Sequence, residues 1–159
     1  MKRGPITVLL GGVVGVLLAS APVGSASAAP APFAVGGGTA FAAGRSYVQF
    51  AFSAHGQPQN ASGHITLNWP PATGQPGSDH GQMLARVTCL VVTGGTATAY
   101  GRVTKSVNPD VPFRPDWVGI YVTDRPNTFY GFFGSGNPPC DNEPHGPVPF
   151  YSGNVVVRD

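Results

Sequence analysis

Charged side chains are scarce in this sequence and give no sign of a nucleic-acid partner. Across 159 residues there are 9 Lys and Arg residues against 7 Asp and Glu residues. Two of the basic residues, Lys2 and Arg3, belong to an N-terminal segment that we expect to be removed, which leaves 7 residues of each sign and a net charge of zero. Because no basic cluster remains in the sequence, nucleic acid and anionic membrane surfaces are excluded as expected partners.

Amphipathic helical patterns are also lacking beyond the N-terminal segment. The chain instead carries runs in which apolar and polar residues alternate, the pattern of half-buried strands, with turn residues between them. These runs predict a single all-β domain. There are seven of them, at 46–54, 64–69, 86–93, 96–107, 117–123, 128–133 and 151–158. The expected fold is an antiparallel β-sandwich or β-barrel of about seven strands, and the periodicity leaves both arrangements open.

The clearest of these patterns is a hairpin around Gly94-Gly95. Two glycines supply the positive φ angles that a two-residue hairpin turn requires. On the second strand the period of two predicts a solvent face of Thr96, Thr98, Tyr100, Arg102, Thr104 and Ser106, and an interior face of Ala97, Ala99, Gly101, Val103 and Val107. The first strand is apolar on both faces around Leu90, so we expect it to be covered on both sides. In the 46–54 run the phenylalanines are assigned to the core.

The N-terminus has the features of a secretory signal peptide. Lys2 and Arg3 precede an apolar run from Ile6 to Ala19, and Ala26-Ser27-Ala28 is a small-residue cleavage site. A membrane anchor is the alternative, but the apolar run is short and is interrupted by glycines. We therefore expect a signal peptide at residues 1–28, a flexible leader rich in Pro and Gly at 29–44, and a β domain at 45–159. The mature protein is predicted to be secreted and extracellular, with no stable membrane span.

Cysteine is limited to two residues, Cys89 and Cys140, and both lie in the exported part. In an oxidising compartment such a pair predicts one disulfide. Its loop of about 50 residues is worth roughly 4 kcal/mol in the chain-entropy model. Neither cysteine has the C-x-x-C or C-x-x-H spacing of a metal site, and no metal or cofactor is predicted.

Several segments resemble a group of small secreted proteins of high-GC Gram-positive bacteria. The resemblance rests on Val87-Thr88-Cys89-Leu90, on Gly101-x-Val103-Thr104-Lys105-Ser106 and on the closing run from Ser152 to Asp159, and it covers most of residues 46–159. It implies a short exported β-rich domain with one cysteine pair. It implies no assigned activity and supplies no catalytic residue.

Residues suited to catalysis are present but follow no catalytic pattern. Ser78-Asp79-His80, or Ser135 with Asp141 and His145, would supply the residue types of a triad, yet the G-x-S-x-G nucleophile elbow is missing. The histidines, His55, His64, His80 and His145, lack the spacing of a zinc site. No catalytic residue is predicted.

Outward aromatic residues and one irregular loop are the candidates for binding. Trp117 and Tyr121 share a strand face about 13 Å apart, and Tyr130 is expected on the same side, where the rings would stack on sugars or contact a protein unless the 108–115 and 138–149 loops cover them. The 134–149 loop, held by Cys140, is the other candidate. The possible binding surface comprises Trp117, Tyr121, Tyr130, Asn137, Asp141 and His145.

These observations predict a secreted, non-enzymatic binding or surface-interaction module whose extracellular ligand or protein partner is unknown. Two alternatives stay open. One is a small secreted hydrolase that uses His and Asp residues in loops. The other is a β-barrel that carries a small ligand in an apolar interior.

Overall fold

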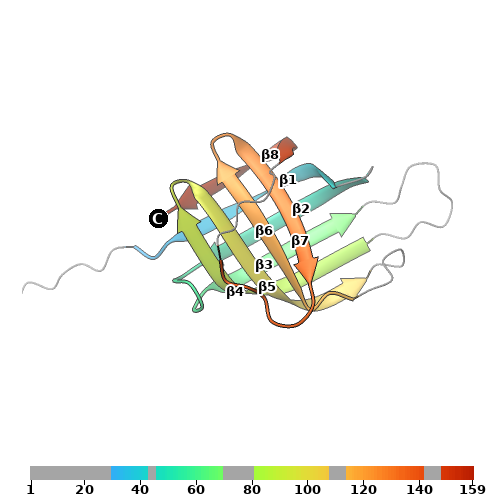
Figure 1. Cartoon of the computed structure of the whole chain (residues 1–159). Coiled ribbons are helices and arrows are strands. Elements are labelled where there is room, and N and C mark those ends of the chain that lie inside the picture. The colour runs from blue at the N-terminus through green and yellow to red at the C-terminus, as the bar shows by residue number, and fades with distance from the viewer. Residues whose placement is uncertain (1–29, 43–45, 70–80, 108–113, 142–147) are drawn as a thin grey trace, which may run out of the picture.

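The chain folds into a closed antiparallel β-barrel in which each strand pairs with its neighbours in sequence (Figure 1). The computed structural model describes residues 30–42, 46–69, 81–107, 114–141 and 148–159. The all-β antiparallel prediction is confirmed, and of the two arrangements left open the structure is the barrel. Its strands are β1 (Phe33–Ala42), β2 (Ser46–His55), β3 (Ser62–Trp69), β4 (Gly81–Thr93), β5 (Thr96–Val107), β6 (Trp117–Asp124), β7 (Asn127–Gly134) and β8 (Val148–Arg158).

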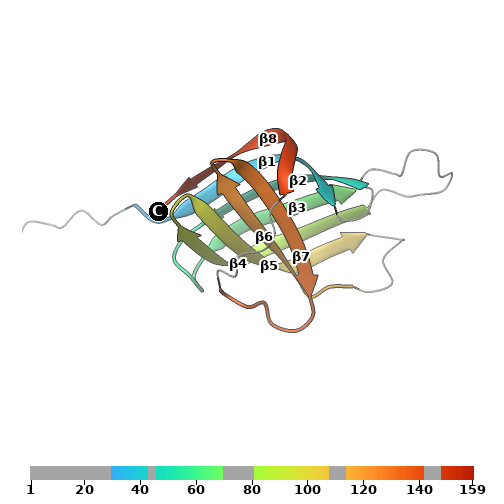
Figure 2. The ribbon, with the colours of Figure 1, turned by 45° about the horizontal axis from the view of Figure 1, so that its top comes forward.

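The first strand corrects the prediction of a flexible leader. β1 lies within residues 29–44 and closes the barrel by pairing with β2 on one side and with β8 on the other (Figure 2). Its glycines are what allow this: a Cβ on Gly36 would lie 2.5 Å from the Asn154 carbonyl oxygen, and a Cβ on Gly38 would collide with the Ser152 carbonyl oxygen. The close approach of β8 therefore needs residues without side chains, although glycine is a poor strand former in isolation. The expected signal peptide at 1–28 lies outside the described residues.

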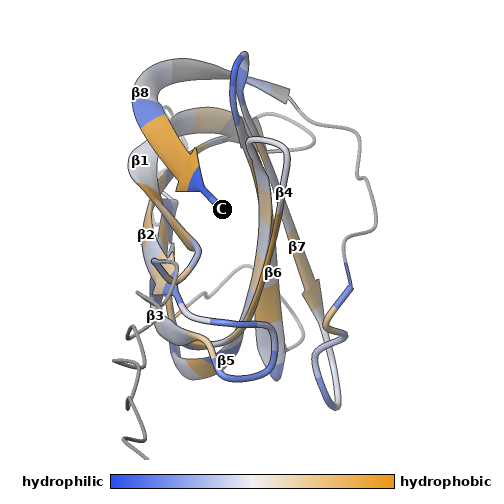
Figure 3. Ribbon diagram, turned by 90° about the vertical axis from the view of Figure 1, so that its left-hand side faces the viewer, coloured by the Kyte–Doolittle hydropathy of each residue, from blue (hydrophilic) through white to orange (hydrophobic). Residues whose placement is uncertain are grey.

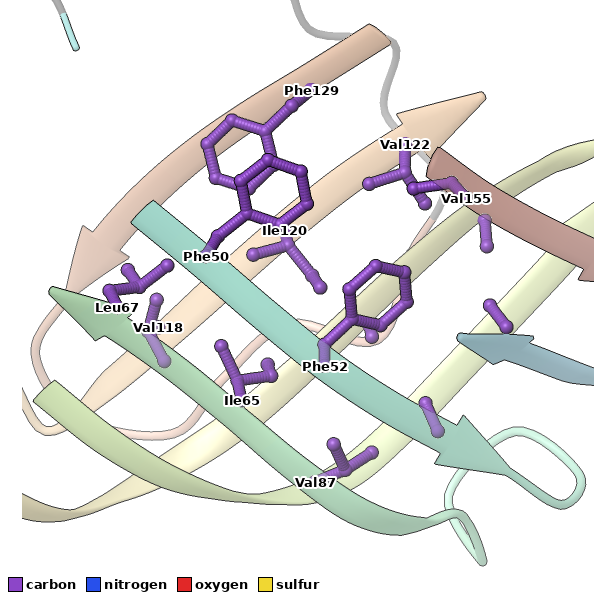
Figure 4. Close-up of a cluster of buried hydrophobic side chains, with 14 of the residues drawn as sticks. Phe50, Phe52, Ile65, Leu67, Val87, Val118, Ile120, Val122, Phe129 and Val155 are labelled. Carbon is purple, nitrogen blue, oxygen red and sulfur yellow. The ribbon is translucent and has the colours of Figure 1, made fainter. Parts of the chain in front are cut away.

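The barrel interior is filled with side chains. Viewed along the barrel, the strands surround one interior space (Figure 3), and buried aromatic and aliphatic side chains from several strands meet there (Figure 4). Phe50 of β2 stacks on Phe129 of β7 across the interior, with ring centroids 4.2 Å apart. Phe50 and Phe52 are 4% and 5% exposed, which confirms that the phenylalanines of this strand are core. The register places both rings beside inward glycines, Gly38 and Gly36, so small residues on β1 make room for large ones on β2.

The β4–β5 hairpin forms as predicted, but it contains two irregularities. Gly94 and Gly95 have φ angles of 57° and 78°, as a two-residue turn of this kind requires. The register shifts between Val87 and Cys89 and again between Leu84 and Ala85, whose partners on β5 are Lys105 and Val103. A β-bulge exchanges the inward and outward positions that follow it. Val107, which the sequence pattern assigned to the interior, is for this reason 46% exposed.

The predicted disulfide is present between Cys89 and Cys140, with Cα atoms 5.8 Å apart. It joins β4 to the chain segment that follows β7. Cys89 and Leu90, which point to opposite faces of β4, are both buried, as expected of a strand covered on both sides. None of the described segments is a helix of the length and apolar character that a membrane crossing would need.

Candidate binding surface

The outward side chains of β6 and β7 form an aromatic face, defined here as Trp117, Tyr121, Tyr130 and Phe132. The strand register sets its rows: Tyr121 lies between Thr98 of β5 and Tyr130 of β7, and the next row runs from Tyr100 through Gly119 to Phe132. All four residues of the aromatic face are partly exposed. The alternation of β6 explains the arrangement, because Val118, Ile120 and Val122 are buried in the interior and the residues between them point outward.

Two glycines let rings of this face lie against the sheet. A Cβ on Gly119 would overlap the Phe132 ring, and a Cβ on Gly134 would overlap the Trp117 ring. Each ring therefore occupies the space of a missing side chain on the neighbouring strand. Trp117 and Phe132 are edge to face, with centroids 6.0 Å apart, and Phe132 lies 6.0 Å from Tyr130 at an interplanar angle of 27°. The result is a continuous group of rings in contact with one another, two of which lie close to the backbone of the neighbouring strand.

A second layer adjoins this face. Residues 135–141, which we call the 135–141 segment, turn back outside β5 and β4 (Figures 1 and 2). Beyond the disulfide and the Tyr100–Asp141 bond described below, three contacts hold it: the Trp117 indole Nε1 donates to the Ser135 carbonyl oxygen at 3.2 Å, the Gly136 N–H donates to Asp116 Oδ2 at 2.7 Å, and Arg102 donates to Asn137 Oδ1.

Tyr100 lies beneath this layer. Its hydroxyl donates to Asp141 Oδ1 at 2.5 Å, and its ring meets Trp117 and Phe132 edge to face at centroid distances of 5.8 and 5.4 Å. Tyr100 and Thr98 are 1% and 0% exposed. The prediction that these two residues face solvent is therefore wrong. Both point outward but are buried, and Tyr100 is covered by Trp117, Phe132 and the 135–141 segment. The loop after β7 was expected to cover outward aromatic side chains. Its described part lies over Tyr100, while the aromatic face stays partly exposed.

Five of the six residues predicted as a possible binding surface lie on this side of the barrel. Trp117, Tyr121 and Tyr130 belong to the aromatic face, and Asn137 and Asp141 lie in the adjoining 135–141 segment. The sixth, His145, lies outside the described residues. Tyr100, which the sequence pattern places on an outward face, forms the base of this surface. The pattern did not single out Phe132, although the outward positions of an alternating strand are the signal that would have included it.

The described part of the chain assembles no catalytic or metal centre from the residues considered above. Ser78, Asp79, His80 and His145 lie outside it, so those triads have no structural description. No group of three or more His, Cys, Asp or Glu side chains within the described ranges is arranged to hold a metal ion. One polar pair was not anticipated: His55 Nε2 and Ser62 Oγ are 2.8 Å apart on the exposed outer face of β2 and β3. It arises because the short β2–β3 connection makes these residues register partners.

Comparisons with known proteins give no role to any of these residues. No family model, curated protein or solved structure matches the chain. The argument for function therefore depends on the chemistry of the outer face.

Proposed function

We propose that this protein is a secreted, non-catalytic module that binds glycans on its aromatic face. The observation that carries the proposal is the pair of rings, Trp117 and Phe132, that lie over Gly134 and Gly119 on neighbouring strands. Both rings lie close to the backbone of the neighbouring strand and stay partly exposed, and because their interplanar angle is 77° the surface offers ring faces and ring edges together. Sugar rings present patches of C–H groups that pack against aromatic rings.

The shape of the surface favours a glycan over a protein partner. Protein hot spots are side chains that fill pockets on the partner. None of the four residues of the aromatic face is among the most exposed large apolar residues of the described chain, which are Phe33, Val35, Tyr47, Val107 and Phe133. Partly exposed rings that pack on one another suit the C–H patches of pyranose units better.

Rigidity supports the same conclusion. The rings stand on paired strands rather than on loops, and the 135–141 segment fixes the Trp117 indole through the bond to Ser135. The disulfide holds that segment to β4. A preorganised surface of this kind loses little conformational entropy when a ligand binds.

Two further observations bear on the competing functions. A carried ligand would need the space that Phe50, Phe129 and their neighbours occupy inside the barrel. A hydrolase would need a carboxylate to orient its histidine, and among the described residues His55 contacts Ser62 without one. The N-terminal segment with signal-peptide features and the disulfide both favour export, which would bring the protein to glycans outside the cell.

The test is retention on polysaccharides. The full chain, with its disulfide intact, is incubated with chitin, cellulose, xylan and peptidoglycan, and with the acidic glycans described below. We expect retention on at least one polymer, and about a tenfold loss of affinity, or roughly 1.4 kcal/mol, for Trp117→Ala and for Phe132→Ala. Phe33→Ala, an exposed aromatic residue on β1, is the matched control and should bind as the unchanged protein does.

Two results would contradict the proposal. One is a failure of every polymer to retain the protein. The other is retention that Trp117→Ala and Phe132→Ala leave unaltered. Thermal unfolding of each variant, measured in parallel, shows whether a loss of binding reflects a loss of fold.

A further inference from the structure

A row of basic side chains crosses the outer face of the barrel and ends at the aromatic face. The register pairs His64 of β3 with Arg86 of β4, Arg86 with Arg102 of β5, and Arg102 with Trp117 of β6. His64, Arg86 and Arg102 are all exposed. We call these three residues the basic row. They are far apart in the sequence, so the charge cluster exists only in the folded barrel.

The basic row is an unfavourable arrangement for the protein alone. Outward residues directly opposite each other on antiparallel strands have Cβ atoms about 5 Å apart, and like charges so placed repel. Arg86 and Arg102 are in this position, between the two bulges of the hairpin. Among the described residues no carboxylate forms an ion pair with either guanidinium. The Arg102 guanidinium donates a hydrogen bond to the neutral side-chain amide of Asn137.

The carboxylates near the aromatic face are already engaged. Asp141 accepts from the Tyr100 hydroxyl, and Asp116 accepts from the Gly136 N–H. Both bonds hold the 135–141 segment in place, so these groups act in the structure rather than as counter-ions of the basic row. The described residues therefore supply no counter-ion for Arg86 and Arg102, which is the reason to look to an anion from outside the chain.

We propose that the ligand is a glycan that carries carboxylates, with its acid groups bound along the basic row while a neighbouring sugar ring packs on Trp117. This inference rests on the proposed function. A guanidinium matches a carboxylate with two parallel hydrogen bonds, which neither a neutral sugar nor a lysine contact provides. Because Arg102 and Trp117 are register partners, one ligand reaches both.

The spacing of the sheet agrees with a polymer that runs across the strands. Neighbouring strands are about 4.8 Å apart, a distance comparable to the length of one pyranose unit. A uronate chain perpendicular to β4, β5 and β6 would therefore place successive units over Arg86, Arg102 and Trp117. The positive charge of the row supplies attraction that weakens as salt is added.

The experiment compares uronate polymers with their uncharged counterparts. Polygalacturonate, alginate and hyaluronan, and the carboxyl-reduced form of each, are titrated into the full chain with its disulfide intact. We expect at least one acidic polymer to bind about tenfold or more tightly than its reduced form, which is the range of a charge-assisted hydrogen bond. Arg86→Gln and Arg102→Gln should each remove most of this preference, whereas Arg158→Gln, an exposed arginine on β8, should keep it.

A second readout does not depend on the choice of polymer. Because Arg86→Gln relieves repulsion between like charges, its unfolding temperature without ligand should equal or exceed that of the unchanged protein. A clear fall would show that Arg86 stabilises the fold and would contradict the inference.

The outcomes separate this inference from the proposed function. Equal binding of acidic and carboxyl-reduced polymers, or arginine variants that behave as Arg158→Gln does, would overturn the acidic ligand and leave a glycan-binding module. Polyphosphate is titrated in parallel, and binding to it without binding to any uronate would also overturn the acidic glycan. If none of these polymers binds, the acidic ligand is overturned, and the proposed function fails as well when the neutral polysaccharides of the first test do not bind either.

Discussion

The outer faces of β2–β3 and of β5–β7 follow the same strand geometry and have different surroundings. On β2 the outward residues from Tyr47 to His55 are exposed and the residues between them are buried, and the same alternation continues into β3, where His64 is exposed. On β5 five successive residues, 97–101, are buried on both faces. Alternation therefore predicts both side-chain direction and exposure on β2, but on β5 it predicts direction alone.

The difference comes from the second layer. Tyr100 and Thr98 are polar residues at outward positions, and both are buried. The rings of Trp117 and Phe132 and Asp141 of the 135–141 segment lie over Tyr100. Nothing comparable covers the outer face of β2 and β3 in the described part of the chain. A period of two thus identifies which residues share a face, whereas solvent exposure depends on what the tertiary structure places there.

The largest effect should come from removing the disulfide that holds the second layer. The double variant Cys89→Ala with Cys140→Ala opens a loop of 51 residues, which lowers the free energy of unfolding by about 4 kcal/mol in the chain-entropy model. Urea unfolding measures the loss. Native-state hydrogen exchange should show that amides of β5 lose more protection than amides of β3, because the second layer covers β5.

Reduction of the unchanged protein is the control and should reproduce the unfolding midpoint of the double variant. Equal midpoints with and without reductant would show that the disulfide adds no stability. An equal loss of protection on β3 and β5 would show that the two faces do not differ in the way described.

A matched pair of threonines sharpens the comparison at smaller scale. Thr66 of β3 and Thr98 of β5 both point outward, but Thr66 is half-buried and Thr98 is fully buried. Replacement by Ala costs similar strand propensity at the two sites, so that contribution cancels. Thr98→Ala should lower the free energy of unfolding by about 1 to 2 kcal/mol more than Thr66→Ala, because it removes a buried methyl and hydroxyl. Equal losses in chemical denaturation would contradict the contrast.

Features set by local sequence could be predicted. The Gly94-Gly95 turn, the inward phenylalanines of β2 and the pairing of the two cysteines follow from turn chemistry, from period two and from cysteine arithmetic. The outward aromatic strand residues Trp117, Tyr121 and Tyr130 were identified for the same reason, since strand direction is local information.

Features that depend on contacts between segments far apart in the sequence could not be predicted. β1 is rich in glycine, and only the approach of β8 and the large rings of β2 explain why it forms a strand. Without that strand, a sandwich and a barrel are equally consistent with the remaining pattern. The basic row has the same origin, because Arg86 and Arg102 become neighbours through a register that the bulge between Val87 and Cys89 displaces from simple counting.

The smallest effect concerns the hydrogen bond between Tyr100 and Asp141, which links the buried face of β5 to the second layer. Tyr100→Phe keeps the ring and removes the donor, so the free energy of unfolding should fall by about 1 kcal/mol. Asp141→Asn retains an acceptor oxygen and should cost less. Tyr47→Phe, at an exposed tyrosine on β2, should stay within about 0.5 kcal/mol of the unchanged protein. If Tyr100→Phe were as neutral as Tyr47→Phe, the second layer would owe its position to the disulfide and the other segment contacts, and Tyr100 would contribute packing alone.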